Sequence, residues 1–402
     1  MIVRHRWLTW CVGFLIALSW FSCRPQLRPV RWTWANALKQ VRPPELADDS
    51  PPASLRDAVT TTLARLQQLD PAQIHHLGPQ PVSNQKLRES LADFQAKLEE
   101  IGWNDAFFRY LRENFLFYRS VADPVLFTGY YEPLLRGSLQ RSDIYAYPLY
   151  RRPDNLLIVD LNKYYFYPKY PDLPGLLRGR LEENNHVVPY YSRQEIDTDS
   201  KLAGQNLELL WVDSLVDLFF LQIQGSGIVE LDSGERLRIG YADQNGQPYR
   251  SIGRFLIDSG ALTKDQGSMQ AIKQYLNQHP EKWPEVLNLN PSYIFFRALE
   301  GNEPGPIGSL GVPLTPGRSV ATDLRLFPPG ALAFIECEKP VFDDQKRILR
   351  WEKFRRFVLN QDTGGAIRGP DRVDLFTGNG EMAELIAGQM KQPGALYFLI
   401  KK

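Results

Sequence analysis

The residues best suited to do chemistry are three aspartates next to glycine-rich turns. Asp362 and Asp374 lie on either side of two consecutive glycines. These glycines are Gly364 and Gly365, and Asp323 follows a Pro-Gly turn earlier in the chain. A chain that reverses between Asp362 and Asp374 would bring both carboxyl groups to one rim, where glycines let a ligand approach the backbone closely. A lone aspartate of this kind usually satisfies a turn, but the cluster favours acid–base chemistry.

Two other segments combine aromatic rings with amide and hydroxyl groups. Thr128 and Tyr130 belong to the first, FTGYYEP, and Gln224, Gly225 and Ser226 belong to the second, LQIQGSG. Flat rings pack under the C–H faces of sugars, and paired donors and acceptors bind sugar hydroxyl groups. These segments therefore suit a carbohydrate site. A core position for Tyr130 and a plain turn at Gly225 fit the same residues, and both interpretations stay open here.

Composition excludes several other kinds of protein. The 402 residues hold 47 Lys and Arg against 46 Asp and Glu, which argues against a disordered polyelectrolyte and against a surface built throughout to bind nucleic acid. None of the five histidines has the spacing of a zinc enzyme or the context of a Ser–His–Asp hydrolase. Cys337 is the one cysteine of the chain body, so we expect no disulfide framework or thiolate metal cluster and a buried thiol.

The start of the chain has the pattern of an export signal. Basic residues precede an apolar run, Trp7–Phe21, that is followed closely by Cys23. The run is shorter than the roughly 20 residues that span a bilayer, and this arrangement is typical of a secretory signal. Cys23 suits the acylation of a bacterial lipoprotein. We therefore predict that residues 1–23 are a signal peptide or a membrane or lipid anchor, and that the body lies outside the cytoplasmic membrane.

The order of secondary-structure signals predicts an α+β protein that is mainly β. Apolar residues at helical spacing mark two early segments, 55–66 and 87–98, and the second stops at Gly102. A third segment, 105–118, is rich in aromatic residues, and all three are expected to form helices. Later helical stretches are 251–262 and 269–276. Turn residues at 232–234 and 245–246 are hairpin signals. Strand-like runs lie at 293–297, 331–336, 354–359 and 396–400.

Together these segments resemble the membrane-bound lytic murein transglycosylase A family, which carries the three-aspartate domain. The matching motifs, in order, are FTGYYEP (127–133), LQIQGSG (221–227), GYADQNGQPYRSIG (240–253), NPSYIFFR (290–297), GVPLTPGRSVATD (311–323) and QDTGGAIRGPDRVDLFTG (361–378). The resemblance implies a double-psi β-barrel built from residues 24–131 and 261–402, with helices at its N-terminal side. It also implies a small β domain inserted at 132–260, and a three-aspartate segment at about 290–402.

The resemblance further implies an activity. Family members cleave the β-1,4 bond between N-acetylmuramic acid and N-acetylglucosamine and leave a 1,6-anhydromuramyl end. By motif, Asp374 is the catalytic residue, Asp362 is its close neighbour, and Asp323 is the third, structural or supporting, member. The residues expected to bind substrate are Thr128, Tyr130, Gln224, Gly225, Ser226, Gly364 and Gly365.

The resemblance also implies partners and a location. We expect peptidoglycan glycan strands as the substrate and neither a metal nor an organic cofactor. Candidate partners are a membrane or lipid anchor at the N-terminus and cell-wall synthesis proteins, whereas nucleic acid is not expected. The expected location is the periplasm or cell envelope, with an outer-membrane lipoprotein as the anchored form.

One carboxyl group is sufficient for this chemistry. An ordinary glycosidase needs two carboxylates, because a water molecule or a protein nucleophile must attack C1. A muramyl ring carries its own C6 hydroxyl group, whose attack on C1 within the same molecule has a large effective molarity. Asp374 would protonate the glycosidic oxygen and then accept the C6 hydroxyl proton. It has to begin protonated, so we expect burial and Asp362 to raise its pKa.

Three other functions are weighed against this one. A hydrolase would use Asp362 as the base that delivers water to C1, and it would release a reducing end. A non-catalytic peptidoglycan-binding envelope lipoprotein would keep the groove without turnover, but the presence of all three aspartates argues against it. A purely structural envelope protein is disfavoured because open, glycine-rich acidic turns contribute little to a core.

Overall fold

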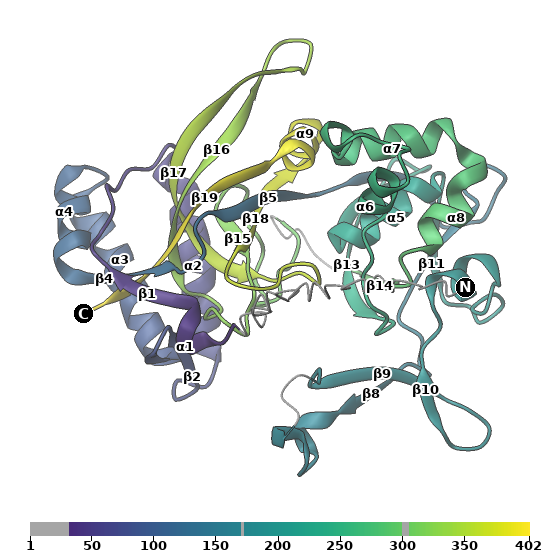
Figure 1. Cartoon of the computed structure of the whole chain (residues 1–402), viewed down its shortest axis with the longest axis horizontal. Coiled ribbons are helices and arrows are strands. Elements are labelled where there is room, and N and C mark those ends of the chain that lie inside the picture. The colour runs from purple at the N-terminus through teal and green to yellow at the C-terminus, as the bar shows by residue number, and fades with distance from the viewer. Residues whose placement is uncertain (1–31, 170–172, 300–304) are drawn as a thin grey trace, which may run out of the picture. The chain divides into compact units, whose positions relative to one another are not determined.

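The computed structural model describes residues 32–169, 173–299 and 305–402 (Figure 1). Residues 1–23, for which the sequence predicts a signal peptide or an anchor, lie outside the described residues. Within those ranges, no helix combines the length and the apolar character needed to cross a bilayer. The chain from Trp32 to Lys402 forms one compact unit.

A closed barrel organises much of the described chain. Its strands are β5 (Val125–Glu132), β15 (Ser319–Ala321), β16 (Leu332–Phe342), β17 (Ile348–Asp362), β18 (Arg372–Asn379) and β19 (Lys391–Lys401). They pair in the order β19-β16-β17-β15-β18-β5, and β5 pairs again with β19 to close the ring. Outside the ring, β4 (Phe115–Ser120) pairs with β19, and β1 (Leu38–Val41) pairs with β4.

Helices cover the outside of this barrel. They are α2 (Pro52–Gln68), α3 (Asn84–Ile101) and α4 (Asp105–Asn114), of which α2 contacts β17 and α3 contacts β19 (Figure 1). The centres of β16 and β19 are buried on both faces, inside the barrel and beneath the helices. Strands buried on both faces carry continuous apolar runs rather than alternation, which explains the sequence at 331–336 and 396–400.

Local signals set where the helices begin and end. The Ser83 side chain accepts a hydrogen bond from the Lys86 amide at the start of α3, and Gly102 ends this helix at a φ of 80°. The Asn104 side chain caps α4 in the same way. The expected helix over 105–118 is wrong in its last turn, because Phe115 begins β4. There the backbone hydrogen-bonds to β19 and β1 instead of continuing the helix.

A second sheet has the order β14-β13-β12-β6-β11-β7. Its strands are β6 (Leu134–Ser138), β7 (Tyr147–Tyr150), β11 (Glu208–Val212), β12 (Ser226–Leu231), β13 (Arg236–Gln244) and β14 (Ile294–Ala298). Helices accompany it: α5 (Leu215–Gln224), α6 (Ile252–Asp258), α7 (Met269–Gln278) and α8 (Trp283–Asn288). The strand β14 joins this sheet although it follows residue 260.

The two hairpin signals have different outcomes. The turn at 232–234 joins β12 to β13, as predicted. The hairpin at 245–246 is wrong. The buried Asn245 side chain instead donates to the carbonyls of Tyr191 and Pro291 and accepts from the amide of Tyr293. These bonds fix a loop that leads into α6.

Short elements complete the described chain. A three-stranded sheet consists of β8 (Leu157–Asp160), β9 (Leu176–Leu181) and β10 (Val187–Pro189). Other elements are α1 (Trp34–Ala37), β2 (Ile74–Leu77), β3 (Gln80–Ser83) and α9 (Glu381–Gln389). Single turns of 3-10 or π helix lie at Leu161–Lys163, Tyr167–Lys169, Gln194–Thr198, Lys264–Gln266 and Pro280–Lys282.

A buried ion pair ties the segment before α2 to the barrel. Arg318 and Asp48 are both essentially inaccessible to solvent, and Arg318 Nη1 lies 2.6 Å from Asp48 Oδ2. Arg318 also donates to the carbonyls of Ser50, Pro51 and Phe357. A buried charge with this many partners is costly to leave unpaired.

We predict that Asp48→Ala lowers the free energy of unfolding by about 3–5 kcal/mol, because it leaves the Arg318 guanidinium buried without its counter-charge. Urea unfolding of the full chain, followed by circular dichroism, measures the change. Glu352→Ala is the control, since its partner Arg350 is exposed and an exposed pair contributes at most about 1 kcal/mol. Equal midpoints for the two variants would contradict the prediction.

Candidate active site

Strand register places Asp362 and Asp374 on either side of the same small residue, Ala321. Ala321 on β15 lies opposite Asp362 on β17 and also opposite Asp374 on β18. The β15–β17 register shifts by one residue just before this point, which makes Asp362 level with Ala321. On the next strand, β5, Thr128 lies opposite Asp374. Four neighbouring strands therefore contribute to one site.

Two donors on β5 engage the two carboxyl groups. The Thr128 hydroxyl group donates to Asp374 Oδ1, and the Tyr130 hydroxyl group donates to Asp362 Oδ2 at 2.9 Å. Thr128 and Tyr130 are two residues apart on a strand and so point to the same face. Both carboxyl groups therefore reach the same face of the barrel wall, as the expected chain reversal required.

Asp374 has the electrostatics of a general acid. Its side chain is 19% exposed, and Arg372 Nη2 lies 3.5 Å from its Oδ1. Burial raises the pKa of Asp374 to about 6, with Arg372 opposing the rise and the Asp362 charge adding to it. A carboxyl group with this pKa keeps roughly a tenth of its protons at neutral pH, so it can both give and accept a proton.

Asp362 is held by fixed donors. The Ser309 amide donates to its Oδ1 at 2.9 Å, opposite the Tyr130 contact at Oδ2. Burial raises the pKa of Asp362, although the hydrogen bonds from Ser309, Thr363 and Tyr130 act in the lowering direction. Burial and Asp362 together raise the pKa of Tyr130 well above its usual value, so the phenol stays protonated as a donor.

Asp323 lies in a different environment. Its fully buried carboxylate accepts from Arg325 Nε at 2.9 Å, from Arg325 Nη2 at 2.7 Å and from the Gly369 amide at 2.9 Å. Burial alone would raise the pKa of Asp323, but the hydrogen bonds from Arg325 and Gly369 outweigh it and lower the pKa. The carboxylate therefore anchors the turn that connects β17 to β18, and its side-chain bonds are not to Asp362 or Asp374.

The glycines and Gln224 lie at element ends. Gln224 ends α5, and its Oε1 accepts from the Tyr131 amide at 3.1 Å. Gly225 follows as a left-handed cap with a φ of 82°, and Ser226 begins β12. A Cβ added at Gly225 or at Gly365 would meet no other atom within 4 Å. The backbone at these two glycines therefore borders open space.

At Gly364 an added Cβ would come within 3.1 Å of Ile367 Cγ1. This contact is tight, so a side chain at Gly364 would require Ile367 to shift. Space inside the turn, rather than backbone strain, thus favours glycine at this position.

Arg372 is a site residue that the sequence reasoning missed. It contacts Asp374, and its Nη2 lies 3.3 Å from the Thr128 hydroxyl group. Its Nε is buried without a hydrogen-bond partner. Residues two apart on a strand share a face, so Arg372 lies on the same face as Asp374. Its two-residue spacing from Asp374 in a strand is therefore the sequence signal that predicts its place in the site. Ser309 was also missed, and since it acts through its backbone amide its residue type carries no signal.

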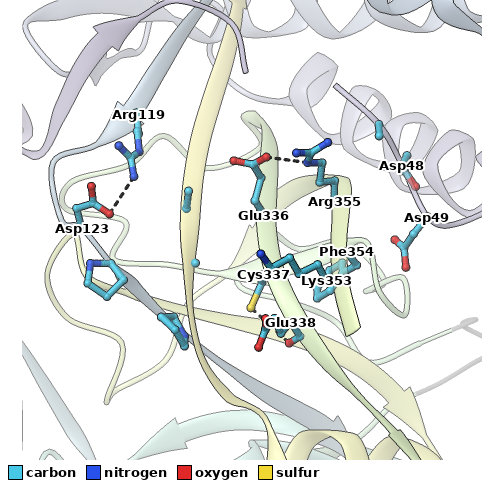
Figure 2. A pocket seen from close by; sticks show the side chains of 15 residues that line it. Asp48, Asp49, Arg119, Asp123, Glu336, Cys337, Glu338, Lys353, Phe354 and Arg355 are labelled. Atoms are coloured by element: carbon cyan, nitrogen blue, oxygen red, sulfur yellow. Dashed lines mark hydrogen bonds and ion pairs between the residues drawn. The ribbon is translucent and has the colours of Figure 1, made fainter. Parts of the chain in front are cut away.

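A large surface pocket lies elsewhere on the barrel. Figure 2 shows its lining, which includes Glu336, Cys337, Lys353 and Arg355, around a volume of about 760 Å³. None of the predicted site residues belongs to this lining. Several of its charges are already paired within the pocket, as are Arg355 and Glu336 at 2.8 Å. Cys337 is buried, as expected, and burial raises the pKa of its thiol to about 12.

Comparisons with known proteins agree with this architecture. Residues 126–297 match the family model described as the MltA specific insert domain, and residues 318–400 match the 3D domain. Membrane-bound lytic murein transglycosylase A of Escherichia coli K12 is 34% identical over 278 residues, which are 68% of this chain and 65% of the relative. The match thus spans slightly less than two thirds of the length of that curated relative.

Solved structures share the fold. A membrane-bound lytic murein transglycosylase from Agrobacterium tumefaciens has a TM-score of 0.73 and 33% identity, covering 91% of this chain and 98% of that chain. E. coli MltA with bound chitohexaose has a TM-score of 0.66 and 23% identity, covering 92% and 96%. Two domain matches and a structural relative 33% identical over nearly its whole length show that this chain belongs to the membrane-bound lytic murein transglycosylase A family.

Proposed function

We propose that this protein is a lytic transglycosylase that cleaves the β-1,4 bond between N-acetylmuramic acid and N-acetylglucosamine in peptidoglycan. Asp374 carries the proposal, since its pKa is raised to about 6 beside a second carboxyl group. The names of the matched relatives support the same reaction class. The product is a 1,6-anhydromuramyl end.

Asp374 performs both proton transfers in this mechanism. Its protonated carboxyl group gives a proton to the glycosidic oxygen as the bond to C1 breaks and the N-acetylglucosamine side departs. The resulting carboxylate accepts the proton of the muramyl C6 hydroxyl group while that oxygen bonds to C1. Arg372 stabilises the carboxylate between these steps, because its guanidinium lies 3.5 Å from Oδ1.

The neighbours of Asp374 prepare it for the first step. Burial and the Asp362 charge raise the fraction of Asp374 that is protonated, while Tyr130 and the Ser309 amide hold Asp362 in place. Thr128 orients the reacting carboxyl group. Asp323 has a supporting role, since its bond to the Gly369 amide holds the turn between β17 and β18.

The glycan strand is the proposed ligand of the surrounding residues. Gln224, Gly225 and Ser226 stand where α5 meets β12, and Gln224 contacts the backbone of β5 next to Tyr130. Gly365, whose backbone borders open space, gives the glycan access to the backbone on the Asp362 side, and Gly364 belongs to the same turn. The bound chitohexaose of the E. coli structure supports a β-1,4-linked amino sugar chain as ligand.

The finer features of the fold belong to the same proposal. We assign the barrel to the double-psi type, supported by the parallel pairs β15–β17 and β18–β5. The proposed domains are the barrel, from 24–131 and 261–402, and the insertion at 132–260, with β14 of the later segment pairing into the sheet of the insertion. An envelope location with residues 1–23 as signal or anchor is supported by the words "membrane-bound" in the names of the relatives.

We predict that Asp374→Asn abolishes turnover while folding and glycan binding remain, because the amide has the shape of the carboxyl group but cannot release a proton to the substrate. Mass spectrometry of soluble products from isolated peptidoglycan is the measurement. Wild-type products should be lighter by one water than hydrolysis products, and the variant should release none.

Three results would change the assignment. Full-mass reducing ends from the wild type would identify a hydrolase with Asp362 as base. Sedimentation with glycan but no products from either form would indicate a binding protein. An active Asp374→Asn variant would show that another residue is the acid.

The pH profile provides a separate test. Since Asp374 must begin protonated, kcat/KM should fall about tenfold per pH unit above its pKa of about 6. Arg372 lowers this pKa and Asp362 raises it. Arg372→Gln should therefore move the descending limb to higher pH, and Asp362→Asn should move it to lower pH. If the descending limbs of the two variants shift in the same direction, or neither shifts, Asp374 is not the titrating acid.

A further inference from the structure

One face of the small sheet β8–β9–β10 is apolar and exposed. The register pairs Gly179 with both Leu157 and Pro189, Val159 with Leu177, and Leu181 with Val187. Paired residues share a face, so these positions form one surface without a polar side chain. Leu177, Leu181 and Val187 are 42%, 55% and 52% exposed.

The opposite face attaches the sheet to the rest of the protein. Arg178 Nε lies 2.9 Å from Asp243 Oδ1 on β13, and the Arg180 guanidinium lies 4.6 Å from the Tyr191 ring centroid. The apolar face, which we call the outer face, therefore points away from these contacts. Burial against the protein does not explain its composition, and an exposed apolar surface of this kind marks an interaction site.

The connection that follows β8 adds exposed aromatic rings and cations. Tyr164 is 46% exposed and Tyr165 is 90% exposed. Lys163 is 82% exposed at its side chain, and Lys169 is also exposed. At the same end of the sheet, Ile158 and Leu176 lie exposed on the other face. This end thus has exposed apolar side chains on both faces and carries tyrosines and lysines. It also holds Asp160, which pairs with Leu176 and whose Oδ2 lies 4.0 Å from Lys163 Nζ.

That composition favours a lipid bilayer over a protein as the occupant. Tyrosines concentrate where hydrocarbon meets headgroups, because the ring is apolar and the hydroxyl group stays hydrated. Lysines extend their chains along the apolar region and place their charge among anionic headgroups. The outer face itself offers only aliphatic groups and no hydrogen-bonding side chain that would specify a protein partner.

The N-terminus gives an independent reason to expect a bilayer nearby, since residues 1–23 have the pattern of an export signal or anchor. We propose that the β8–β9–β10 sheet docks on an anionic phospholipid surface through its outer face and the tyrosines at 164 and 165. This contact would orient the enzyme on the membrane. It does not depend on the proposed catalytic function.

Hydrogen–deuterium exchange of the full chain on vesicles tests the proposal locally, whatever the N-terminal segment does. We expect backbone amides in 157–167 and 176–189 to exchange at least fivefold more slowly on phosphatidylglycerol-rich vesicles than on phosphatidylcholine vesicles. The double variant Leu177→Ser, Leu181→Ser should lose this protection. Leu177 is already 42% exposed and Leu181 55% exposed, so the sheet should remain folded.

Leu349→Ser is the matched control, because Leu349 is 63% exposed near the start of β17, a strand of the barrel sheet and not of this one. It should keep the protection. Lys163→Glu with Lys169→Glu should abolish the difference between the two lipids. Equal exchange on both vesicles and in solution would overturn the proposal. Protection without vesicles that grows with protein concentration would assign the outer face to a second copy of the chain instead.

Discussion

The candidate site depends on the short strand β15 being held between β17 and β18. One residue of that strand, Ala321, is level with both Asp362 and Asp374, so the spacing of the two carboxyl groups is a property of backbone pairing. Closure of the barrel then brings β5 beside β18, which places Thr128 against Asp374 although 246 residues separate them in the chain. A loss of register by one residue at β15 would separate the acids from their donors.

Hydrogen bonds between buried polar side chains of β15, β17 and α2 stabilise this register. Gln361 donates to Thr62 on α2 at 2.8 Å and accepts from Ser319 on β15. Thr322 donates to Asn360 on β17 at 2.8 Å. Arg318, just before β15, joins the same seam to Asp48. The donors and acceptors of these groups are paired with one another. A buried network whose hydrogen bonds are all made specifies one arrangement more sharply than apolar packing does.

Three aspartates show how surroundings divide one residue type into separate roles. Asp323 is buried, but a guanidinium and a backbone amide keep it ionised. Asp362 is buried with neutral donors, and its pKa rises despite them. Asp374 is buried near one cation and one anion whose effects oppose each other, so burial decides and its pKa reaches about 6. A pKa of about 6 suits a group that must donate and then accept a proton.

The sequence alone determined the family, the mainly β class and the residue types of the site, because these follow from motifs and local periodicity. It also determined helix ends such as Gly102, where backbone conformation is a local matter. Tertiary structure decided that Phe115 starts a strand, that Asn245 braces a loop, and that Arg372 joins Asp374. Only the tertiary structure gives Asp323 a different role from Asp362 and Asp374, since the partners and the burial of each aspartate come from segments far apart in the chain.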